Sequence, residues 1–543
     1  MATPAAGDAM VDDPGPHPEA AGRGPGASAS EARAPGGAAA QVGAGIFLSR
    51  LVGFVRDRIF AYYFGTSEVA DAWRAALRTP NVLQNLLGEG TLSASFIPVY
   101  AEFLEEGREE EAGRFAGAAL GILMVVAGLM ALVGVLVAPW LVGLFFFQWS
   151  PEKQALTVGL VRILFPMTGI LVVSAWALGI LNSHRRFFVS YVAPVFWNLA
   201  MIAAMVAGGV WLALGERDLV VALAWGALVG GALQFGVQLP FVARHLTGFR
   251  LSLGRRVEGV AEAIRNFGPV VARGVVNLSG WVDLILAATL ADGAVAVMGY
   301  AQTFYVLPIS LFGMSVAASE LPELSRMRTR ERRLLAGRVS GALRRVSWFL
   351  IPSALLYLAV GDVIVGALYE TGAFGEAQTL VTWGVLAAYA LGLTASARSR
   401  VLSSAFYALR DTKTPARVAT LRVVVSAVVG ILLMAPLDSV GFQRLRLGAA
   451  GLALGASVGA WLEYGLLRRK LAGYIGPHGA PGGALVRMTL AASLGVGAAV
   501  GLQLLVPPVH PALLAVETLI PGGVVYLLAS WALGLGNPLR ILR

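Results

Sequence analysis

Long apolar segments separated by short polar ones run through most of the chain. Each segment has about 20 residues or more, the length that an α-helix needs to cross the roughly 30 Å hydrocarbon core of a bilayer. Gly, Pro and clusters of charge mark the breaks between segments. We therefore expect an all-α polytopic membrane protein with about fourteen transmembrane helices. Their approximate limits are residues 40–64, 79–101, 115–146, 157–181, 188–214, 219–242, 264–290, 295–321, 346–369, 379–407, 417–436, 448–467, 484–506 and 512–535.

Composition agrees with a lipid environment. The 543 residues are 57% hydrophobic and only 14% charged, whereas soluble domains average about 25% charged residues. The chain has no cysteine, which excludes disulfides and thiolate nucleophiles. Its net charge of +10 comes with arginines placed between the apolar segments. This placement favours anionic lipid and membrane topology over nucleic acid as the reason for the charge.

Basic residues are concentrated in alternate loops, which predicts the orientation of the chain. The intervening loops, such as "GERD" and "YETGAFGEAQ", contain hardly any Lys or Arg. The positive-inside rule places the basic loops in the cytoplasm, and both termini with them. The basic loops are residues 183–187, 243–256, 325–338, 409–417 and 466–470.

A tail and an internal repeat divide the chain. Residues 1–37 are rich in Ala, Gly and Pro and nearly lack large apolar side chains, so we expect a disordered tail. "VRD", "RTPN" and "SASFIPVYAE" in the first half have counterparts in "WVD", "VLPI" and "AASELPELSR" in the second. The matching order and spacing predict two six-helix lobes in parallel repeat. We expect an N-terminal lobe at 38–245, a C-terminal lobe at 246–470 and two further helices in 471–543.

Charged residues lie inside the first predicted helix, in "SRLVGFVRDRIFAYYFG" (49–65). An Arg or Asp at the centre of a span costs roughly 2.5–3.5 kcal/mol on the insertion scale. Helical spacing puts Ser49 and Arg56 on one face, and Arg50 and Asp57 on a neighbouring stripe. Such a face predicts a cation-lined cavity for an anionic substrate. The alternative is that the arginines extend to the membrane interface, with Asp57 as their partner.

The second polar segment, "ADAWRAALRTPN", is too polar to face lipid. It carries Asp71, Arg74 and Arg78, and Pro80 interrupts it. A broken helix that lines a cavity would have this pattern. An amphipathic helix lying at the membrane interface is the alternative.

A lone carboxylate, Asp283, stands midway along the seventh predicted helix, with Arg273 earlier in the same helix. Asp283 is a candidate for binding a coupling cation or pairing with an arginine of the other lobe. It is equally suited to a structural hydrogen bond with Asn277 or Ser279. Arg273 is a further candidate for a basic cavity. Histidines lie in loops without metal-ligand spacing, and no phosphate-binding loop or catalytic triad is recognisable, so we expect a transporter without metal or cofactor.

Several of these segments resemble a known family. "SRLVGFVRDRIFAYYFGTSEVADAWRAALRTPN" followed by "GEGTLSASFIPVYAE" is similar to the opening of the MurJ/MviN lipid II flippases of bacterial peptidoglycan synthesis. "LYETGAFG" (368–375) and "RVLSSAFYALRDTKTPARVA" (400–419) resemble later signatures of that family. The resemblance covers roughly residues 40 to 540. It implies the fourteen-helix fold of the multidrug/oligosaccharidyl-lipid/polysaccharide exporter superfamily. It also implies a central cationic cavity lined by Ser49, Arg50, Arg56, Asp57 and Asp71.

Two departures from the family pattern concern expected charges. The family commonly has an arginine soon after its "PN", where this chain has Gln84 and Asn85. Its "YADRL" reads "YAQTF" here, so Gln302 and Thr303 replace an Asp and an Arg. The candidates to supply the missing charge are Arg74, Arg78 and Arg273.

The resemblance implies a flippase in the bacterial cytoplasmic membrane. It would move lipid II or a similar undecaprenyl-pyrophosphate lipid to the outer leaflet by alternating access, with membrane lipids and a candidate coupling cation as partners. A flippase for a related polyprenyl-linked sugar, or a cation-coupled drug exporter of the same superfamily, is the alternative. The arginines argue against an exporter of cations. A membrane glycosyl- or phosphotransferase would need an acidic metal cluster that the sequence does not show, and a scaffold that has lost transport is the remaining option.

Overall fold

The computed structural model describes residues 35–81, 95–254, 256–265, 279–314, 332–442, 445–505 and 510–535, together with Leu92 and Val316. Arg273, Gln84 and the first 34 residues lie outside the described residues. The helices and strands are α1 (Pro35–Phe64), α2 (Glu68–Arg78), α5 (Ile97–Glu105), α6 (Glu109–Phe145), α7 (Pro151–Ser183), α8 (Phe187–Val206), η1 (Ala207–Trp211), α9 (Glu216–Ala243), α11 (Ser279–Ala288), α12 (Ala294–Pro308), η3 (Ile309–Met314), α14 (Arg332–Tyr369), α15 (Glu376–Ala408), α16 (Lys413–Asp438), β1 (Gly441–Phe442), β2 (Leu445–Arg446), α17 (Gly448–Ile475), α18 (Gly482–Leu505) and α19 (Pro511–Ala532).

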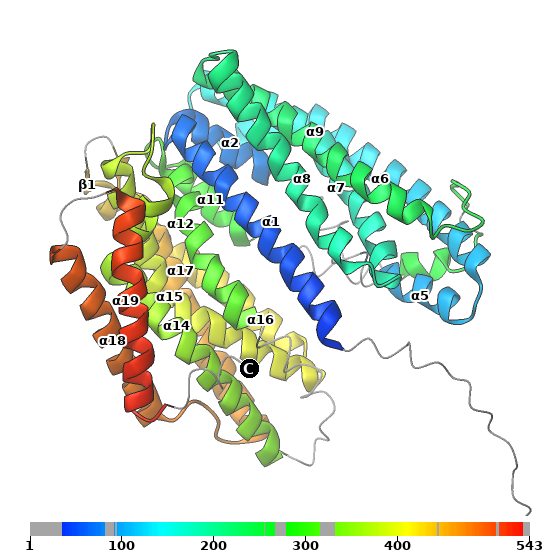
Figure 1. Ribbon diagram of the computed structural model, residues 1–543. Coiled ribbons are helices and arrows are strands. Elements are labelled where there is room, and N and C mark those ends of the chain that lie inside the picture. Colours follow the sequence, from blue (N-terminus) through cyan, green and yellow to red (C-terminus); the bar gives the residue numbers. More distant parts are fainter. Residues whose placement is uncertain are drawn as a thin grey trace, which may run out of the picture.

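Two groups of helices lie on either side of α1 (Figure 1). In the first, α1 packs on α8, α2 on α7, and α6 to α9 on one another; we call α1, α2 and α5–α9 the N-lobe. In the second, α14 packs on α15, α15 and α16 both pack on α17, and α12 contacts α15; we call α11–α17 the C-lobe. The last two helices, α18 and α19, pack on each other and on α14. They cover the side of the C-lobe away from the N-lobe (Figure 1).

Local sequence signals account for several helix ends and contacts. Ser67 begins α2 by accepting a hydrogen bond from the N–H of Ala70, and Ser150 does the same for Lys153 at the start of α7. Small residues let α16 and α17 approach closely, since a Cβ at Gly455 would lie 2.4 Å from the carbonyl oxygen of Ser426. Close packing through glycine is typical of helices that associate inside membranes.

The expected all-helical membrane fold is confirmed, but the count of fourteen spans is not. Within the described residues ten helices are long and apolar enough to cross a membrane, or eleven if the bent α14 counts as one span. Helix α14 bends by 80° at Val360. Helix α2 (Glu68–Arg78) ends before the second predicted span, 79–101, begins, and residues 82–91, 93 and 94 of that span lie outside the described residues. In the part of the chain that the structure describes, the strands are β1 and β2, two residues each, which pair antiparallel between α16 and α17.

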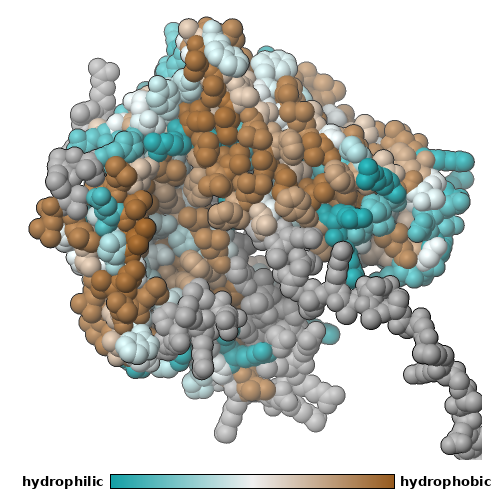
Figure 2. Space-filling view, viewed as in Figure 1, coloured by the Kyte–Doolittle hydropathy of each residue, from teal (hydrophilic) through white to brown (hydrophobic). Residues whose placement is uncertain are grey.

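The outward faces of the helices are apolar. Leu132, Leu136 and Trp140 lie on one side of α6 and are 55%, 68% and 64% exposed. Figure 2 shows hydrophobic residues covering most of the visible N-lobe, with hydrophilic residues gathered at its far end near α5. A continuous apolar surface of this kind is what lipid chains cover.

Candidate functional site

Arg56 lies on α1 and is held by residues of its own lobe. Its Nη2 is 2.7 Å from Oδ1 of Asp57, and its Nη1 donates to Oδ1 of Asn198 at 2.9 Å. The guanidinium also lies 5.5 Å from the centre of the Trp197 ring. At a rise of about 1.5 Å per residue, Arg56 is about 12 Å from the end of α1 at Phe64. The cation is thus held in place, about two turns before the end of the helix, by one carboxylate and one amide.

Arg50 lies about 21 Å from the same end of α1 and reaches the other lobe. Its Nη1 donates to Oγ of Ser310, in η3, at 3.1 Å. Arg50 is exposed, and the neighbouring Ser49 is half-exposed. No carboxylate among the described residues forms an ion pair with Arg50, so its charge is available to an anion between the lobes.

Asp71 joins the lobes at the end where α1 finishes. Its carboxylate accepts hydrogen bonds from the N–H groups of Gly293 at 2.7 Å and Ala296 at 2.8 Å, at the start of α12. It also pairs with Nζ of Lys153, on α7, at 2.9 Å, and Lys153 reaches Asp292 at 2.7 Å. A carboxylate at a helix N-terminus is favoured by the helix dipole and the free N–H groups. We call these five residues the α2–α12 seal.

Backbone contacts extend this closure to α14. Arg58 Nη1 donates to the carbonyl oxygens of Ala367 and Leu368, both at 2.8 Å, at the end of α14. The N–H of Ala373 donates to the carbonyl oxygen of Tyr62 at 2.9 Å. Arg58 therefore serves as a helix C-terminal cap rather than as a free cation.

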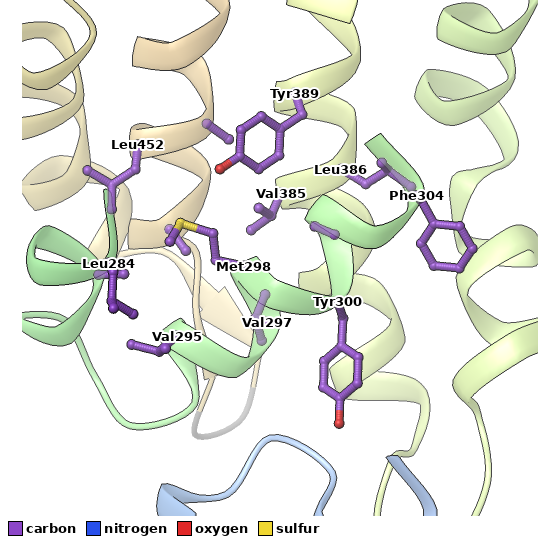
Figure 3. Close-up of a cluster of buried hydrophobic side chains, with 14 of the residues drawn as sticks. Leu284, Val295, Val297, Met298, Tyr300, Phe304, Val385, Leu386, Tyr389 and Leu452 are labelled. Carbon is purple, nitrogen blue, oxygen red and sulfur yellow. The ribbon is translucent and has the colours of Figure 1, made fainter. Parts of the chain in front are cut away.

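Tyr300 adds an aromatic contact between the lobes. Its hydroxyl donates to the carbonyl oxygen of Gly65 at 2.8 Å, and in Figure 3 it points away from Leu452 and Tyr389 of the C-lobe core. Arg74 lies over the Tyr300 ring at 4.7 Å and near Phe60 at 5.3 Å. The predicted cavity residue Arg74 is thus enclosed by aromatic rings next to the seal, where it makes cation–π contacts.

Arg78 and Gln302 connect α2 to the centre of the C-lobe. Arg78 Nη1 donates to Oε1 of Gln302 at 3.3 Å, and Gln302 Nε2 donates to the Tyr389 hydroxyl at 3.1 Å. Thr303, the other departure from the family pattern, donates to the carbonyl oxygen of Gly299 in its own helix. An amide at 302 therefore keeps an acceptor for the arginine of the opposite lobe.

Asp283 lies close enough to Arg78 and Arg422 to interact electrostatically with both. Arg422, on α16, also pairs with Glu463 of α17, with 2.6 Å between Nη1 and Oε2. An ion pair between Asp283 and an arginine of the opposite lobe stays a prediction, for which Arg78 is the candidate. Within the described residues no group of three or more His, Cys, Asp or Glu side chains is placed to hold a metal ion.

Lys153 and Arg58 are the functional candidates that sequence reasoning missed. Lys153 is the one lysine in the loop "QWSPEK", which otherwise belongs to the set of loops with hardly any basic residues. This exception was the sequence signal that could have identified Lys153. The sequence holds no such signal for Arg58, because the residues it contacts are more than 300 positions away in the chain.

Known proteins are similar to this chain in both sequence and fold. A family model described as lipid II flippase MurJ matches residues 60–509. The probable lipid II flippase MurJ of Rhizobium tropici is 32% identical over 431 residues, which cover 78% of each chain. The lipid II flippase MurJ of Burkholderia cenocepacia is 31% identical over 428 residues, covering 77% of this chain and 80% of its own.

Solved structures agree on the fold. A lipid II flippase MurJ in an inward closed conformation superposes with a TM-score of 0.74 at 23% identity, covering 90% of this chain and 98% of its own. An inward-facing multidrug transporter of the MATE family superposes with a TM-score of 0.61 at 14% identity, covering 85% of this chain and 98% of its own. Together with the length of the family match, these relatives place the chain in the MurJ family of lipid II flippases.

Proposed function

We propose that this chain moves lipid II from the inner to the outer leaflet of the bacterial inner membrane, in which it is a multi-pass protein. The observation that carries the proposal is that the two lobes are joined at one end of α1, while arginines lie between them further along the same helix. Contacts from Asp71, Arg58 and Tyr300 join the lobes at the end of α1, while Arg50 and Arg56 lie deeper along the same helix. An anionic headgroup can be held at such a site while the opposite end is open to it.

The arginines would neutralise the pyrophosphate. A doubly charged group in hydrocarbon is costly, and a planar guanidinium can donate two parallel hydrogen bonds to it. We assign Arg50 and Arg56 to the pyrophosphate, with Ser49 beside them and Asp57 orienting Arg56. Arg74 and Arg78 would come within reach of the pyrophosphate when α2 moves. Arg273 stays a candidate for the same role from the sequence alone.

The lobes would rock about this site. We take residues 38–245 and 246–470 as the moving bodies, and the basic loops as cytoplasmic together with both termini. The α2–α12 seal then closes the periplasmic end and must break for release. Helices α18 and α19, within 471–543, lie beside α14. We assign to them the groove along which the lipid tail would move.

Flipping makes and breaks no covalent bond, so the proposal needs no catalytic residue and no cofactor. Energy must still be supplied for a directional cycle. Asp283 is our candidate for coupling to a cation, because its carboxylate lies inside the C-lobe within range of Arg78 from the N-lobe.

A leaflet-accessibility assay tests the proposal. Full-length protein is reconstituted into vesicles with labelled lipid II, and the fraction exposed outside is followed over time. Wild type should expose the lipid, Arg50→Ala and Arg56→Ala should not, and Arg114→Ala, at an exposed site on α6, should match wild type. The same variants are expressed in cells depleted of their own flippase. Full growth with normally expressed Arg50→Ala and Arg56→Ala would refute the mechanism.

A further inference from the structure

A cavity of about 270 Å³ lies inside the N-lobe, among α2, α7, α8 and α9. Its wall includes the polar side chains Asn81, Ser174 and Gln234 and the ring of Trp197. None of the described residues that line it is charged. It is therefore separate in character from the arginine site on α1, although Trp197 is next to Asn198, the partner of Arg56.

Gln234, Ser174 and Gln238 form a chain of hydrogen bonds beside the cavity, which we call the polar ladder. Part of its hydrogen-bonding capacity is unused. Gln234 Nε2 donates to Oγ of Ser174 at 3.2 Å, and that hydroxyl donates to Oε1 of Gln238 at 3.0 Å. Gln238 is 0% exposed, and its Nε2 has no partner among the described residues. Gln238 does not line the cavity, but the amides of Asn81 and Gln234 and the hydroxyl of Ser174 do, and such polar groups inside a membrane protein are costly unless something uses them. A water-filled or ligand-filled cavity would use them.

Trp197 supplies an aromatic surface beside this ladder. Its Nε1 donates to the carbonyl oxygen of Ala227 at 3.1 Å, which fixes the plane of the ring. The ring also lies 5.5 Å from the Arg56 guanidinium. Apolar walls with a few placed amides and hydroxyls are typical of sites for neutral polar ligands. A pyranose fits this description, because its C–H face packs on an aromatic ring and its hydroxyls and acetamido group bond to amides.

We infer that this cavity is a subsite for one neutral sugar ring of the lipid headgroup. The inference rests on the proposed function, since the adjoining Arg56 would hold the pyrophosphate to which that sugar is attached. The volume is below the about 300–1,000 Å³ of clefts that enclose drug-sized ligands, so it admits one ring rather than the whole headgroup. The absence of charge from the described lining excludes the pyrophosphate from it, and the polar ladder disfavours the hydrocarbon tail.

Two lipid probes separate the subsite from the anion site. Full-length protein in nanodiscs is titrated with undecaprenyl pyrophosphate, which has no sugar, and with lipid II. Wild type should bind lipid II more tightly. Gln234→Leu and Ser174→Ala should raise the Kd for lipid II about fivefold to tenfold, the effect of losing one hydrogen bond. The Kd for undecaprenyl pyrophosphate should not change, whereas Arg56→Ala should raise both values.

Thr168→Ala is the matched control. Thr168 is also buried on α7, but its hydroxyl donates only to the carbonyl oxygen of Leu164 in the same helix. The Thr168→Ala variant should keep the wild-type Kd for both lipid II and undecaprenyl pyrophosphate. Because Gln234→Leu removes polarity from a membrane helix, its thermal midpoint should stay level or rise.

The outcomes separate the two hypotheses. If wild type binds the two lipids equally, or if Gln234→Leu weakens both and lowers the thermal midpoint, the subsite is refuted and the flippase proposal stands. If wild type binds neither lipid, the proposed function fails and the subsite with it.

Discussion

Lys153 and Asp71 form an ion pair with 2.9 Å between Nζ and Oδ2, and each side chain is only 2% exposed. The pair connects α7 to α2 inside the N-lobe, and the same carboxylate receives two backbone N–H groups from the start of α12. A buried, hydrogen-bonded ion pair is costly to disturb on one side. The Asp71 carboxylate therefore helps to hold the two lobes together at the end of α1, beside the contacts of Arg58 and Tyr300.

Asp71→Asn should loosen this end of the molecule. Lys153 keeps Asp292 as a partner, so we expect a loss of about 2 kcal/mol rather than the about 3–5 kcal/mol of an isolated buried pair. That shifts a two-state equilibrium roughly 30-fold. The chain has no cysteine, so Ala296→Cys provides a single reporter thiol at a site that is 0% exposed. A membrane-impermeant maleimide should label it faster in the Asp71→Asn background.

Glu68→Gln is the control for this experiment. Glu68 is on the same helix, but its pair with Arg217 is exposed and worth about 0–1 kcal/mol. Equal labelling rates in wild type and Asp71→Asn would mean that the carboxylate does not hold the lobes together.

Arg58→Ala should affect the seal but not lipid binding. The guanidinium donates to two carbonyl oxygens at the end of α14, and charged hydrogen bonds are worth about 1.5–3 kcal/mol. Labelling at Ala296→Cys should therefore accelerate, as in Asp71→Asn. The Kd for lipid II should stay at the wild-type value, in contrast to Arg56→Ala. A large rise in that Kd would instead make Arg58 a ligand of the substrate.

Spacing along α1 predicted a charged face but not the partners of its arginines. Helical periodicity is a local property, and it correctly separated the stripes of Arg50 and Arg56. The partners Asn198 and Ser310 come from distant helices, and no local pattern specifies which helix packs there. The two arginines consequently face different lobes, which only the assembled structure reveals.

Gln302 shows a second limit of prediction from the sequence alone. A glutamine in place of an expected aspartate looks in the sequence like the loss of a partner for an arginine. In the structure Gln302 accepts a hydrogen bond from Arg78 through its carbonyl oxygen and donates another to Tyr389. Glutamine thus lacks the negative charge of an aspartate but keeps an oxygen that can accept a hydrogen bond from the arginine. The end of α2 at Arg78 was easier to predict, because Pro80 follows two residues later.

Gly372→Ala should destabilise the contact between α1 and the loop after α14. Gly372 has a φ of +57°, and a Cβ there would lie 2.4 Å from the carbonyl oxygen of Tyr62. The left-handed conformation alone costs an alanine about 1–2 kcal/mol, and the close contact adds to it. The thermal midpoint of the purified protein should fall. Gly375→Ala, three residues on at a φ of −102°, would place its Cβ in an ordinary contact 3.5 Å from Oε1 of Gln378. It should lower the midpoint less than Gly372→Ala, and equal midpoints for both variants would contradict this assignment.

The stability of the protein should also fall in mild acid because of a histidine pair at the end of the N-lobe near α5. The rings of His184 and His245 stack with 4.1 Å between centres, just beyond the ends of α7 and α9. Desolvation lowers the pKa of both side chains. The charge of His245 lowers that of His184 further, and Arg186 and Arg244 lower that of His245.

Neighbouring groups do not reverse this effect. The Tyr100 hydroxyl lies 3.1 Å from Nε2 of His184, and Glu109 opposes the shift in both rings but by less than burial favours it. Unfolded histidine titrates near 6.5, so the unfolded chain binds more protons than the folded one below that pH. The pair therefore contributes its full stability above about pH 6.5 and loses it as the pH falls through the lowered pKa values.

Thermal midpoints of the full-length protein between pH 7.5 and 5 measure this effect. The midpoint of wild type should decline toward pH 5, and His245→Gln should flatten the decline because a neutral amide replaces one titrating ring. His510→Asn is the control, since His510 lies in another part of the chain, at the start of α19, and its ring accepts a bond from the N–H of Ala512 that an asparagine can replace. Its pH profile should parallel that of wild type. A His245→Gln profile as steep as that of wild type would assign the acid sensitivity to groups other than this pair.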